Sequence, residues 1–530
     1  MATITDYTVD RARLVSVKRP TPVNLIVPVS LQPRMELSEK QKIAHLLRRF
    51  GLGASEAELE YYGKNGLSGA INLLLDYENA PDVTNWDPMI FANDKGVVNI
   101  KVMQNIWMAK LVCTQRPLLE KMTLFWHNHF ATSSQKVTNS FAMNEHVEVL
   151  RENALGNFKS MLLGISRNPA MIFWLDNQEN TVGKPNENFA REVMELFTLG
   201  VDNGYTEKDI QEAARAFTGW RYGIGRFTRD KEPGKRDQFI FSAKDHDYTK
   251  KTIFGQTGPF NGEDVLDLLC QKRQTALYVT QKAWKWFASE DLDAKVIDRI
   301  AAKFYDSKYD IKVLVRAIME APEFYSEKVV RRSIKNPIDF AVPTVRQLGV
   351  GQRVLEQIAE GAANPIESPG DIKINVRLVR ALGPCFALMT STSSMGMELM
   401  SPPDVSGWRT GSYWITSATM VERIKWAERL YVGGTPAPAS NLAANVGGGR
   451  GGPLVGAQAF PLFQENPTPD GAVKALCSIF DIELTGAKYA NLIDAAVKAA
   501  GSGRVTQQNA SAVARAVTKV IFASPEFQLA

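Results

Sequence analysis

The sequence predicts a mainly α-helical protein, with a large multi-helix domain, a small β-hairpin insertion and a second helical subdomain. Most of the 530 residues place apolar side chains at the three- and four-residue spacing of amphipathic helices. Residues 221–260 lose that spacing, and QFIFSA (residues 238–243) has the composition of a short strand, so we expect a hairpin there. Two distant segments, residues 313–325 and 512–528, each follow a helical pattern with Pro-Glu-Phe, which indicates two related helical subdomains.

Proline, glycine and the motifs described below divide the chain into five expected segments. They are an extended, proline-marked arm (1–36), a helical core that carries the polar motifs (37–325), a helical extension with an aromatic turn (326–432), a flexible linker (433–456) and a C-terminal helical subdomain (457–530). The arm cannot be helical because prolines recur along it.

Local signals place the helices in order. We expect a pair of short helices from Ser38 to about Leu75 and longer ones from Ile100 to Leu163, with Pro117 at a helix start. Thr206 followed by Asp209 resembles a capping box that opens another helix. Helical patterns resume over residues 263–319 and 337–357.

Composition narrows the class of protein. Hydrophobic residues make up 45% of the chain and charged residues 22%, which is typical of a soluble globular protein and predicts no membrane span. The net charge of +5 is slight for this length, and although residues 328–335 (KVVRRSIK) are locally basic, nucleic acid is not implied. The four cysteines match no metal or redox spacing.

The segment NENFAREVMELFTLG (186–200) holds the densest polar pattern. On a helix, Asn188, Glu192 and Glu195 fall at i, i+4 and i+7, so an amide and two carboxylates share one face and are placed to converge on a cation. Glu187 and Glu195 also flank Arg191 at four-residue spacing, which is the pattern of ordinary helix ion pairs at ~0.3 kcal/mol each. The pattern is compatible with a catalytic or metal-binding site and also with an ordinary solvated helix face.

Two of the five histidines, His127 and His129, lie in the aromatic segment LEKMTLFWHNHF. On a continuous helix, residues two apart point about 200° apart and cannot bind one metal, whereas at a helix end they can. The polar stretch 131–135 indicates a helix end near Phe130. If the helix continues instead, one of the two is a packed core histidine.

Two further motifs are polar or aromatic loops. Asp245, His246 and Asp247 are consecutive, and carboxylates beside an imidazole raise its basicity or join it on a metal, although the local pattern alone favours a plain polar loop. SPPDVSGWRTGSYWI (401–415) predicts a rigid turn around Trp408 that walls a pocket or fills a core.

These motifs together resemble the bacterial family catalogued as domain of unknown function 1800. The segments that carry the resemblance occur in the family's order: AHLLRRFGLG, FWHNHFATS, NPAMIFWLDNQEN, NENFAREVMELFTLG, YTEKDIQEAARAFTGW, AKDHDYTKKTIFG and SPPDVSGWRTGSYWI. The resemblance runs from about Leu37 to the C-terminal SPEFQ. It implies a large, helical, commonly exported protein and, as partner, a protein of the domain of unknown function 1501 family, but no defined activity.

The first residues do not show the export signal that this resemblance implies. MATITDYTVDRARLVSVKRP lacks the apolar core of a signal peptide. The protein is therefore expected to be cytoplasmic as written, or exported if a leader was removed.

The first functional hypothesis is a metal-dependent hydrolase that acts on a polar or anionic substrate. The expected ligands for zinc, manganese or iron are His127, His129, His246, Asp247 and Asp176. Glu192 or Glu195 would be the general base, and Arg191 or Arg215 would bind substrate charge. Asn188, Trp220 and Trp408 would contact the substrate.

Two alternatives stay open at this point. The first is a non-catalytic helical scaffold that binds a partner protein or a glycan, in which the polar motifs are buried networks between helices and Trp408 and Trp414 stack on sugar rings. The second is a metal-dependent oxidoreductase, which would use the same ligands with iron or copper.

Overall fold

The structure is a computed structural model of the chain, and it describes residues 36–223, 238–368, 372–432, 454–501 and 503–530. Contacts group the chain into two units, residues 1–37 and 38–530. All described helices and strands belong to the second unit. The predicted arm (1–36) lies outside the described residues except for Glu36, as does the predicted linker (433–456) up to residue 453.

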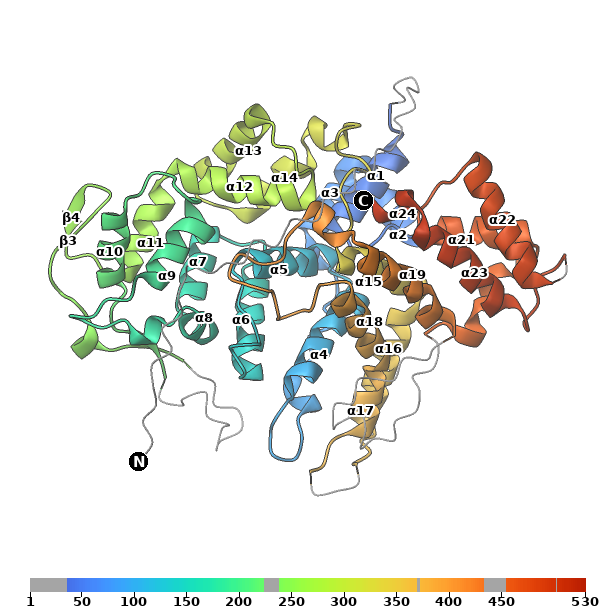
Figure 1. Ribbon diagram of the computed structural model, residues 1–530, viewed down its shortest axis with the longest axis horizontal. Coiled ribbons are helices and arrows are strands. Elements are labelled where there is room, and N and C mark those ends of the chain that lie inside the picture. The colour runs from blue at the N-terminus through green and yellow to red at the C-terminus, as the bar shows by residue number, and fades with distance from the viewer. Residues whose placement is uncertain (1–35, 224–237, 369–371, 433–453, 502) are drawn as a thin grey trace. The chain divides into compact units, whose positions relative to one another are not determined.

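The prediction of a mainly α-helical protein is confirmed (Figure 1). The first half of the second unit contains α1 (Glu39–Phe50), α2 (Glu56–Gly63), α3 (Gly66–Leu75), the short 3₁₀ turns η1 (Tyr77–Asn79) and η2 (Pro88–Phe91), α4 (Ile100–Cys113), α5 (Pro117–His129), α6 (Ser140–Glu152), α7 (Phe158–Ser166), α8 (Pro169–Trp174), η3 (Asn177–Glu179), α9 (Glu187–Glu192), the π-helical turn η4 (Val193–Thr198) and α10 (Glu207–Ala216).

The second half is also helical. It contains η5 (Ala243–Asp245), α11 (Gly262–Gln271), α12 (Arg273–Phe287), α13 (Ala294–Asp306), α14 (Ile311–Met319), η6 (Pro322–Tyr325), α15 (Pro337–Gln347), α16 (Val350–Ala363), α17 (Val376–Ala381), α18 (Gly383–Ser394), η7 (Gly411–Trp414), α19 (Ser417–Tyr431), η8 (Gly456–Phe463), α21 (Pro469–Ile479), α22 (Gly486–Ala500), α23 (Ala510–Ala523) and α24 (Pro525–Gln528). Among the described residues, no helix is both long enough and apolar enough to cross a lipid bilayer.

The expected hairpin region contains two small antiparallel sheets. Strand β1 (Trp220–Tyr222) pairs with β2 (Phe239–Phe241), which lies in the predicted QFIFSA strand, and β3 (Lys251–Ile253) pairs with β4 (Gln256–Gly258). Phe254 and Gly255 join β3 to β4 with φ angles of 51° and 76°. Two consecutive positive φ values are those of a type I′ turn, whose twist matches that of the flanking strands.

Capping explains where several helices begin. The Ser38 side chain accepts a hydrogen bond from the Gln41 amide at the start of α1, and Thr206 does the same with Asp209 at the start of α10. The capping box predicted at Thr206 is thereby confirmed, and Pro117 is the first residue of α5, as expected. Each such cap satisfies backbone donors that a helix start otherwise leaves unpaired.

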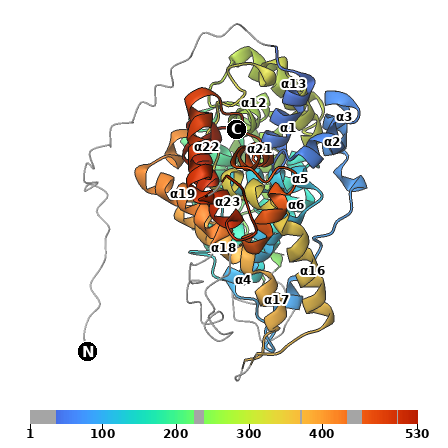
Figure 2. The same ribbon diagram turned by 90° about the vertical axis from the view of Figure 1, so that its right-hand side faces the viewer.

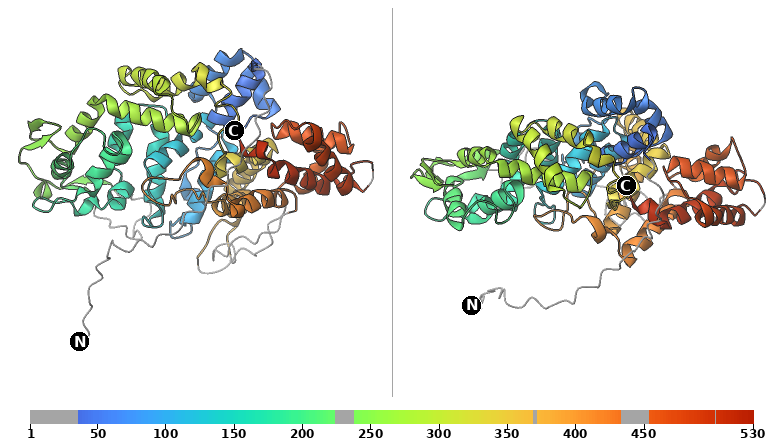
Figure 3. Two further views of the ribbon diagram at one scale, coloured as in Figure 1. Left: turned by 45° about the horizontal axis from the view of Figure 1, so that its top comes forward. Right: turned by 90° about the horizontal axis from the view of Figure 1, so that it is seen from above.

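Helix α5 is surrounded by protein on every side, because all of its residues from Pro117 to His129 are buried. It contacts α6, α1, α12, α3 and α4. Figure 2 shows α5 and α6 next to each other, and Figure 3 shows the light-green helices α12 and α13 side by side. Polar residues of α5, including His127 and His129, are therefore inside the protein.

The repeated Pro-Glu-Phe segments have similar local structure. Helix α14 leads into η6 with Pro322 in its first turn, and α23 leads into α24 with Pro525 in the same position. The phenylalanines Phe324 and Phe527 are both buried, at 0% and 2% exposure. Helix α23 also packs along α19 and α22, which joins the C-terminal helices to the rest of the unit.

Candidate functional site

The ion pairs that the sequence predicts around Arg191 are confirmed. Its guanidinium nitrogens lie 3.2 Å from a Glu187 carboxylate oxygen and 3.4 Å from one of Glu195. A third partner comes from α10, because Arg191 makes two hydrogen bonds of 2.8 and 2.7 Å to the two oxygens of Glu207. Arg191 is thus engaged by three carboxylates and joins α9 to the start of α10.

The next residue, Glu192, has a different environment. It lies at the end of α9, where the helix widens into the π-helical turn η4. Within the described part of the chain, its half-buried carboxylate has no hydrogen bond and no ion pair. Burial, followed by the charge of Glu195, raises the pKa of Glu192. A carboxylate without a partner at a π-helical turn matches a pattern common at functional sites.

Helix α12 contributes Tyr278, on which the charge of Glu192 acts, and Lys282 next to Tyr278. The Lys282 ammonium nitrogen lies 5.6 Å from the centre of the Tyr278 ring, and both side chains are half-buried. Burial, and next the charge of Glu192, raises the pKa of Tyr278 to about 12. Burial, followed by the charge of Lys285, lowers the pKa of Lys282 to about 8. Among the described residues, Lys282 makes no ion pair.

Sequence reasoning did not identify Tyr278 or Lys282. They are four residues apart on α12, so they share a helix face, but this spacing alone does not distinguish them from an ordinary surface pair. What identifies these two residues is the packing of α12 against another part of the chain. Helix α12 packs against η4, and the Gln274 amide donates a 3.0 Å hydrogen bond to the Leu199 carbonyl just after that turn.

His129, the last residue of α5, lies close to Tyr278. Its Nε2 lies 3.1 Å from the Phe197 carbonyl oxygen, and because a carbonyl only accepts, Nε2 carries the proton. The other ring nitrogen, Nδ1, is buried without a partner. The rings of His129 and Tyr278 have centres 6.4 Å apart. Burial, and next the charge of Lys282, lowers the pKa of His129 well below its ordinary value, so the ring is neutral.

These residues form what we call the Glu192 cluster, which consists of His129, Glu192, Tyr278 and Lys282. Three secondary elements supply them: the end of α5, the junction of α9 with η4, and α12. A carboxylate of raised pKa and an ammonium whose pKa is lowered to about 8 are groups suited to proton transfer, and the neutral imidazole adds a hydrogen-bond acceptor, Nδ1, that has no partner among the described residues.

Arg215 and Asp247 belong to a second, saturated cluster. The Arg215 guanidinium donates hydrogen bonds of 2.8 Å to Asp247 and 2.7 Å to Glu212, and another to the hydroxyl of Thr249. Glu212 also accepts a 3.0 Å hydrogen bond from the Thr252 amide on β3. Burial opposes ionisation of Asp247, but the hydrogen bonds from Arg215 and Thr249 outweigh it and lower its pKa. These bonds anchor the β3–β4 hairpin to α10.

His246 is fixed by the backbone next to this cluster. Its Nδ1 donates a 2.8 Å hydrogen bond to the Thr218 carbonyl, and the Asp247 amide donates one of 2.8 Å to the Thr218 hydroxyl. The His246 ring also meets Tyr248 edge-on at 4.7 Å. These bonds hold the Asp-His-Asp loop against the end of α10.

His127 lies in an aromatic environment separate from His129. Helix α5 extends to His129, so the two histidines are both helical and face different neighbours. The His127 ring stacks on Trp408 at 5.4 Å and lies 5.3 Å from Trp107, and both of its nitrogens are buried without a partner. His146 meets it edge-on at 5.7 Å. Burial, and next His146, lowers the pKa of His127 to about 3.

The turn that carries Trp408 is docked on α5. The Trp408 amide donates a 2.6 Å hydrogen bond to the Asn128 side chain, and Gly407, with φ of 85°, passes so close that a Cβ there would lie 2.3 Å from the Asn128 carbonyl oxygen. Trp408 is 4% exposed, so its ring fills the core beside His127.

Asp176, Asn188 and Trp220 meet around residues 175–177, where each has its own partners, since the Asn177 side chain donates a 3.1 Å hydrogen bond to the Trp220 carbonyl. The Lys136 ammonium lies 2.7 Å from the Asp176 carboxylate. Asn188 donates a 3.0 Å hydrogen bond to the Leu175 carbonyl. Trp220 is 2% exposed and packs edge-on against Phe217.

The described part of the chain contains no group of three or more His, Cys, Asp or Glu side chains placed to hold one metal ion. The five predicted ligands are divided between the surroundings of His127, of His129, of His246 with Asp247, and of Asp176. The structure therefore brings Glu192, Glu195, Arg191 and His129 into one region, and it places the remaining predicted site residues elsewhere.

Comparison with known proteins establishes the family but no activity. No curated protein and no solved structure matches the chain. A family model described as "Protein of unknown function (DUF1800)" matches residues 45–529, which is nearly the whole chain and includes every element of the Glu192 cluster. The chain therefore belongs to the family of domain of unknown function 1800.

Proposed function

We propose that the protein is a hydrolase that acts on a polar or anionic substrate through the Glu192 cluster. The observation that carries this proposal is that the Glu192 carboxylate has no partner among the described residues, although the neighbouring Arg191 is paired with three acids. An unpaired, half-buried carboxylate lowers stability, and such groups concentrate where a protein binds or transforms a ligand.

Glu192 is the general base of the proposed reaction. A base works best when its pKa is close to the working pH, and burial together with Glu195 moves the pKa of Glu192 upward from its ordinary value. In hydrolysis, Glu192 takes the proton of the attacking water while that water forms a bond to the substrate's carbonyl or equivalent centre. The leaving group then departs with a proton that the base returns.

Lys282 supplies the cation of the site. Its ammonium has no carboxylate partner in the described part of the chain, so its charge is available to an anionic substrate or to negative charge that develops in the reaction. Tyr278 contacts Lys282 through its ring and lies close enough to Glu192 for the carboxylate charge to raise its pKa, and its hydroxyl is a further donor. Glu192, Tyr278 and Lys282 are half-buried, so each keeps some contact with solvent.

The roles expected for other residues change with this geometry. The guanidinium groups of Arg191 and Arg215 already donate hydrogen bonds to carboxylates. We therefore assign the binding of the substrate's negative charge to Lys282. Glu195 acts on the pKa of Glu192. The metal-dependent hydrolase and the oxidoreductase both require a ligand set, and the cluster offers only the His129 Nδ1 and the Glu192 carboxylate as donors of that kind. Glu192 and Lys282 therefore carry the proposed chemistry.

A helical scaffold that binds a partner protein or a glycan is the second candidate. It is favoured by the hydrogen-bonded ion pairs of Arg191 and Arg215, which join α9 to α10 and α10 to the β3–β4 hairpin. The partner expected from the family resemblance, a protein of the domain of unknown function 1501 family, stays a prediction under either candidate. The cellular compartment is likewise a prediction.

Substrate screening with a matched variant separates the candidates. Wild type, Glu192→Gln and Glu187→Gln are tested on chromogenic carboxylic, phosphate and sulfate esters and on glycosides. Glu187→Gln is the control because it removes a carboxylate from the same helix, one that pairs with Arg191. We expect turnover that falls about 10²-fold or more in Glu192→Gln and persists in the control. Equal turnover in all three proteins would contradict the proposal. No turnover, together with a lower melting temperature of Glu192→Gln, would favour the scaffold.

A further inference from the structure

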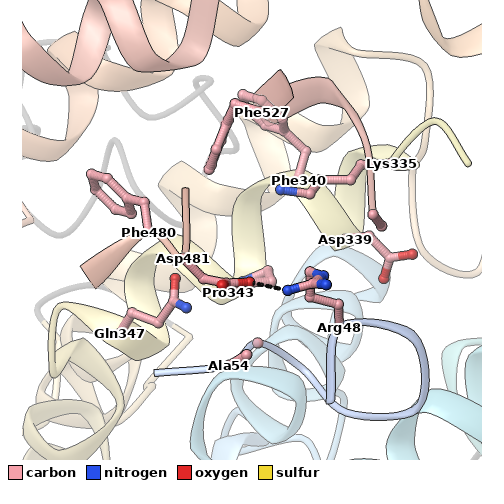
Figure 4. Close-up of a pocket in the computed structure, with 12 residues that line it drawn as sticks. Arg48, Ala54, Lys335, Asp339, Phe340, Pro343, Gln347, Phe480, Asp481 and Phe527 are labelled. Carbon is pink, nitrogen blue, oxygen red and sulfur yellow. Dashed lines mark hydrogen bonds and ion pairs between the residues drawn. The ribbon is translucent and has the colours of Figure 1, made fainter. Parts of the chain in front are cut away.

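A small cavity lies where α1 meets the start of α15 and the C-terminal helices (Figure 4). Side chains of both charges and two aromatic rings line it, among them Arg48, Lys335, Asp339, Phe480, Asp481 and Phe527. The volume of the cavity that the centre of a water molecule can occupy is about 20 Å³. This exceeds the ~10–15 Å³ needed to hold one water, so the cavity has room for a small ion and not for a nucleotide or sugar.

Lys335 is the unusual residue of this cavity. It is 8% exposed, yet its ammonium has no hydrogen bond or ion pair to any described residue. Its contact is with the Phe527 ring, whose centre lies 3.9 Å from the nitrogen. Figure 4 shows the Lys335 chain reaching into the space between the Phe527 ring and the Arg48–Asp481 ion pair. A cation–π contact offsets only part of the cost of burying a charge.

The carboxylates near Lys335 already have other partners. Asp481 lies 2.5 Å from the Arg48 guanidinium and 3.2 Å from that of Arg331. Asp339 is paired with the buried ammonium of Lys121 and accepts a 2.9 Å hydrogen bond from the Asn336 side chain.

Two cationic and two carboxylate side chains line the cavity, and the excess of positive charge around Lys335 comes from Arg331 beside them, because Lys121 already pairs with Asp339. Arg48, Arg331 and Lys335 share one nearby carboxylate, Asp481, while Glu483, which acts on Arg331, is exposed to solvent. Burial, followed by the charge of Arg331, lowers the pKa of Lys335 well below its ordinary value. A negative ion in the cavity would reverse this effect and stabilise the ammonium form.

We propose that this cavity binds a small oxyanion, held between the Lys335 ammonium and the Arg48 guanidinium. Phosphate, sulfate or the carboxylate of a small organic acid has the charge, the acceptor oxygens and the size that the cavity accommodates. The residues involved lie outside the Glu192 cluster, so this inference does not rest on the proposed function.

A bound oxyanion would also join distant parts of the chain. Arg48 belongs to α1, Lys335 immediately precedes α15, and Asp481 follows α21. An ion held between them adds an interaction that exists only in the folded protein, and this raises the apparent stability by an amount that grows with the logarithm of the ion concentration above the Kd. Oxyanion binding thus has a thermal readout that is independent of any catalytic activity.

Calorimetric titration of the full chain with inorganic phosphate, sulfate and acetate tests this proposal, with chloride at matched ionic strength as the reference. Lys335→Met removes the proposed ligand. Lys328→Met is the control, because Lys328 lies in the same basic run but is exposed. We expect one oxyanion per chain, a higher melting temperature in its presence, and roughly tenfold or greater loss of affinity in Lys335→Met but not in Lys328→Met.

The outcomes are distinct. Binding of phosphate and sulfate without acetate would define a tetrahedral oxyanion site, and binding of acetate as well would extend the site to carboxylates. Lys335→Met removes an unpaired buried charge and should fold at least as well as wild type, and its melting temperature without added anion checks this. No saturable binding by folded wild type, or equal affinity in Lys335→Met and wild type, would overturn the proposal.

Discussion

Arg191 and Glu207 form a two-pronged ion pair, with nitrogen to oxygen distances of 2.8 and 2.7 Å, across the junction of α9 and α10. This pair orients the Arg191 guanidinium toward α10, and the adjacent Glu192 has no ion pair with any described residue. Glu192 instead lies near Tyr278 of α12. One helix thus carries a structural ion pair and a free carboxylate at consecutive residues, and this division underlies the proposed site.

Gly407→Ala should destabilise the protein by about 2 kcal/mol or more. Its φ of 85° is unfavourable for alanine, and the added Cβ would lie 2.3 Å from the Asn128 carbonyl oxygen, which would push the Trp408 turn away from α5. Chemical denaturation measures the loss. Gly383→Ala is the control, because a Cβ there meets nothing within 4 Å at a helical position, and alanine should leave stability equal or slightly higher. Equal stability of wild type and Gly407→Ala would show that the turn is not docked as described.

Acid should destabilise the fold before the carboxylates titrate. Burial lowers the pKa of His127 to about 3 and of His146 to about 4, from an ordinary value of ~6.5. The unfolded chain therefore binds protons in this range while the folded chain does not, so the free energy of unfolding is fully present above pH ~6.5 and falls toward pH 4. Urea unfolding at pH 7, 6 and 5 checks this direction.

The variant His127→Phe isolates one of these groups. Phenylalanine fills the space between Trp107 and Trp408 without burying unpaired nitrogens, so we expect stability at pH 7 that is equal to or about 1 kcal/mol above wild type. Its stability should also depend less on pH between 7 and 5. A steeper dependence, or a large loss at pH 7, would mean that His127 has a polar partner.

Lys282 should react as an amine near pH 8. Burial lowers its pKa to about 8, compared with ~10.4 for an ordinary lysine, so its nucleophilic neutral form is populated at lower pH. Acetylation with a trace of acetic anhydride across pH 7 to 11, read by mass spectrometry against N-acetyl-lysine amide, gives its titration curve. A midpoint near 10.4 would contradict the half-buried environment described for this residue.

Local signals in the sequence predict the helices well. Apolar periodicity, the Thr206 capping box and the proline at the start of α5 each depend on residues within one helix, and each is confirmed. Lost periodicity over residues 221–260 predicts one hairpin, whereas the structure forms two small sheets there, β1–β2 and β3–β4.

The site is predicted less completely because its defining property is the absence of a partner. Helical spacing places Glu192 and Glu195 together and correctly pairs Arg191 with Glu195. Whether Glu192 is paired depends on which residues α10 and α12 bring to it, and these lie far away in the sequence. The neighbours of His127 and His129 also depend on distant parts of the chain. The two residues lie on one helix, but His127 stacks on Trp408 and His129 is hydrogen-bonded to the Phe197 carbonyl.

The most direct test of the Glu192 cluster is the free energy of unfolding of Glu192→Gln, measured beside Asp247→Asn. We expect the free energy of unfolding of Glu192→Gln to equal that of wild type or to exceed it by ~0.5–1 kcal/mol, because the substitution removes a half-buried charge that has no partner among the described residues. Asp247→Asn should lose ~1–3 kcal/mol, because it breaks the bond from Arg215 that anchors the hairpin. A loss in Glu192→Gln as large as that in Asp247→Asn would show that Glu192 holds the helices together, and would contradict its place in a site.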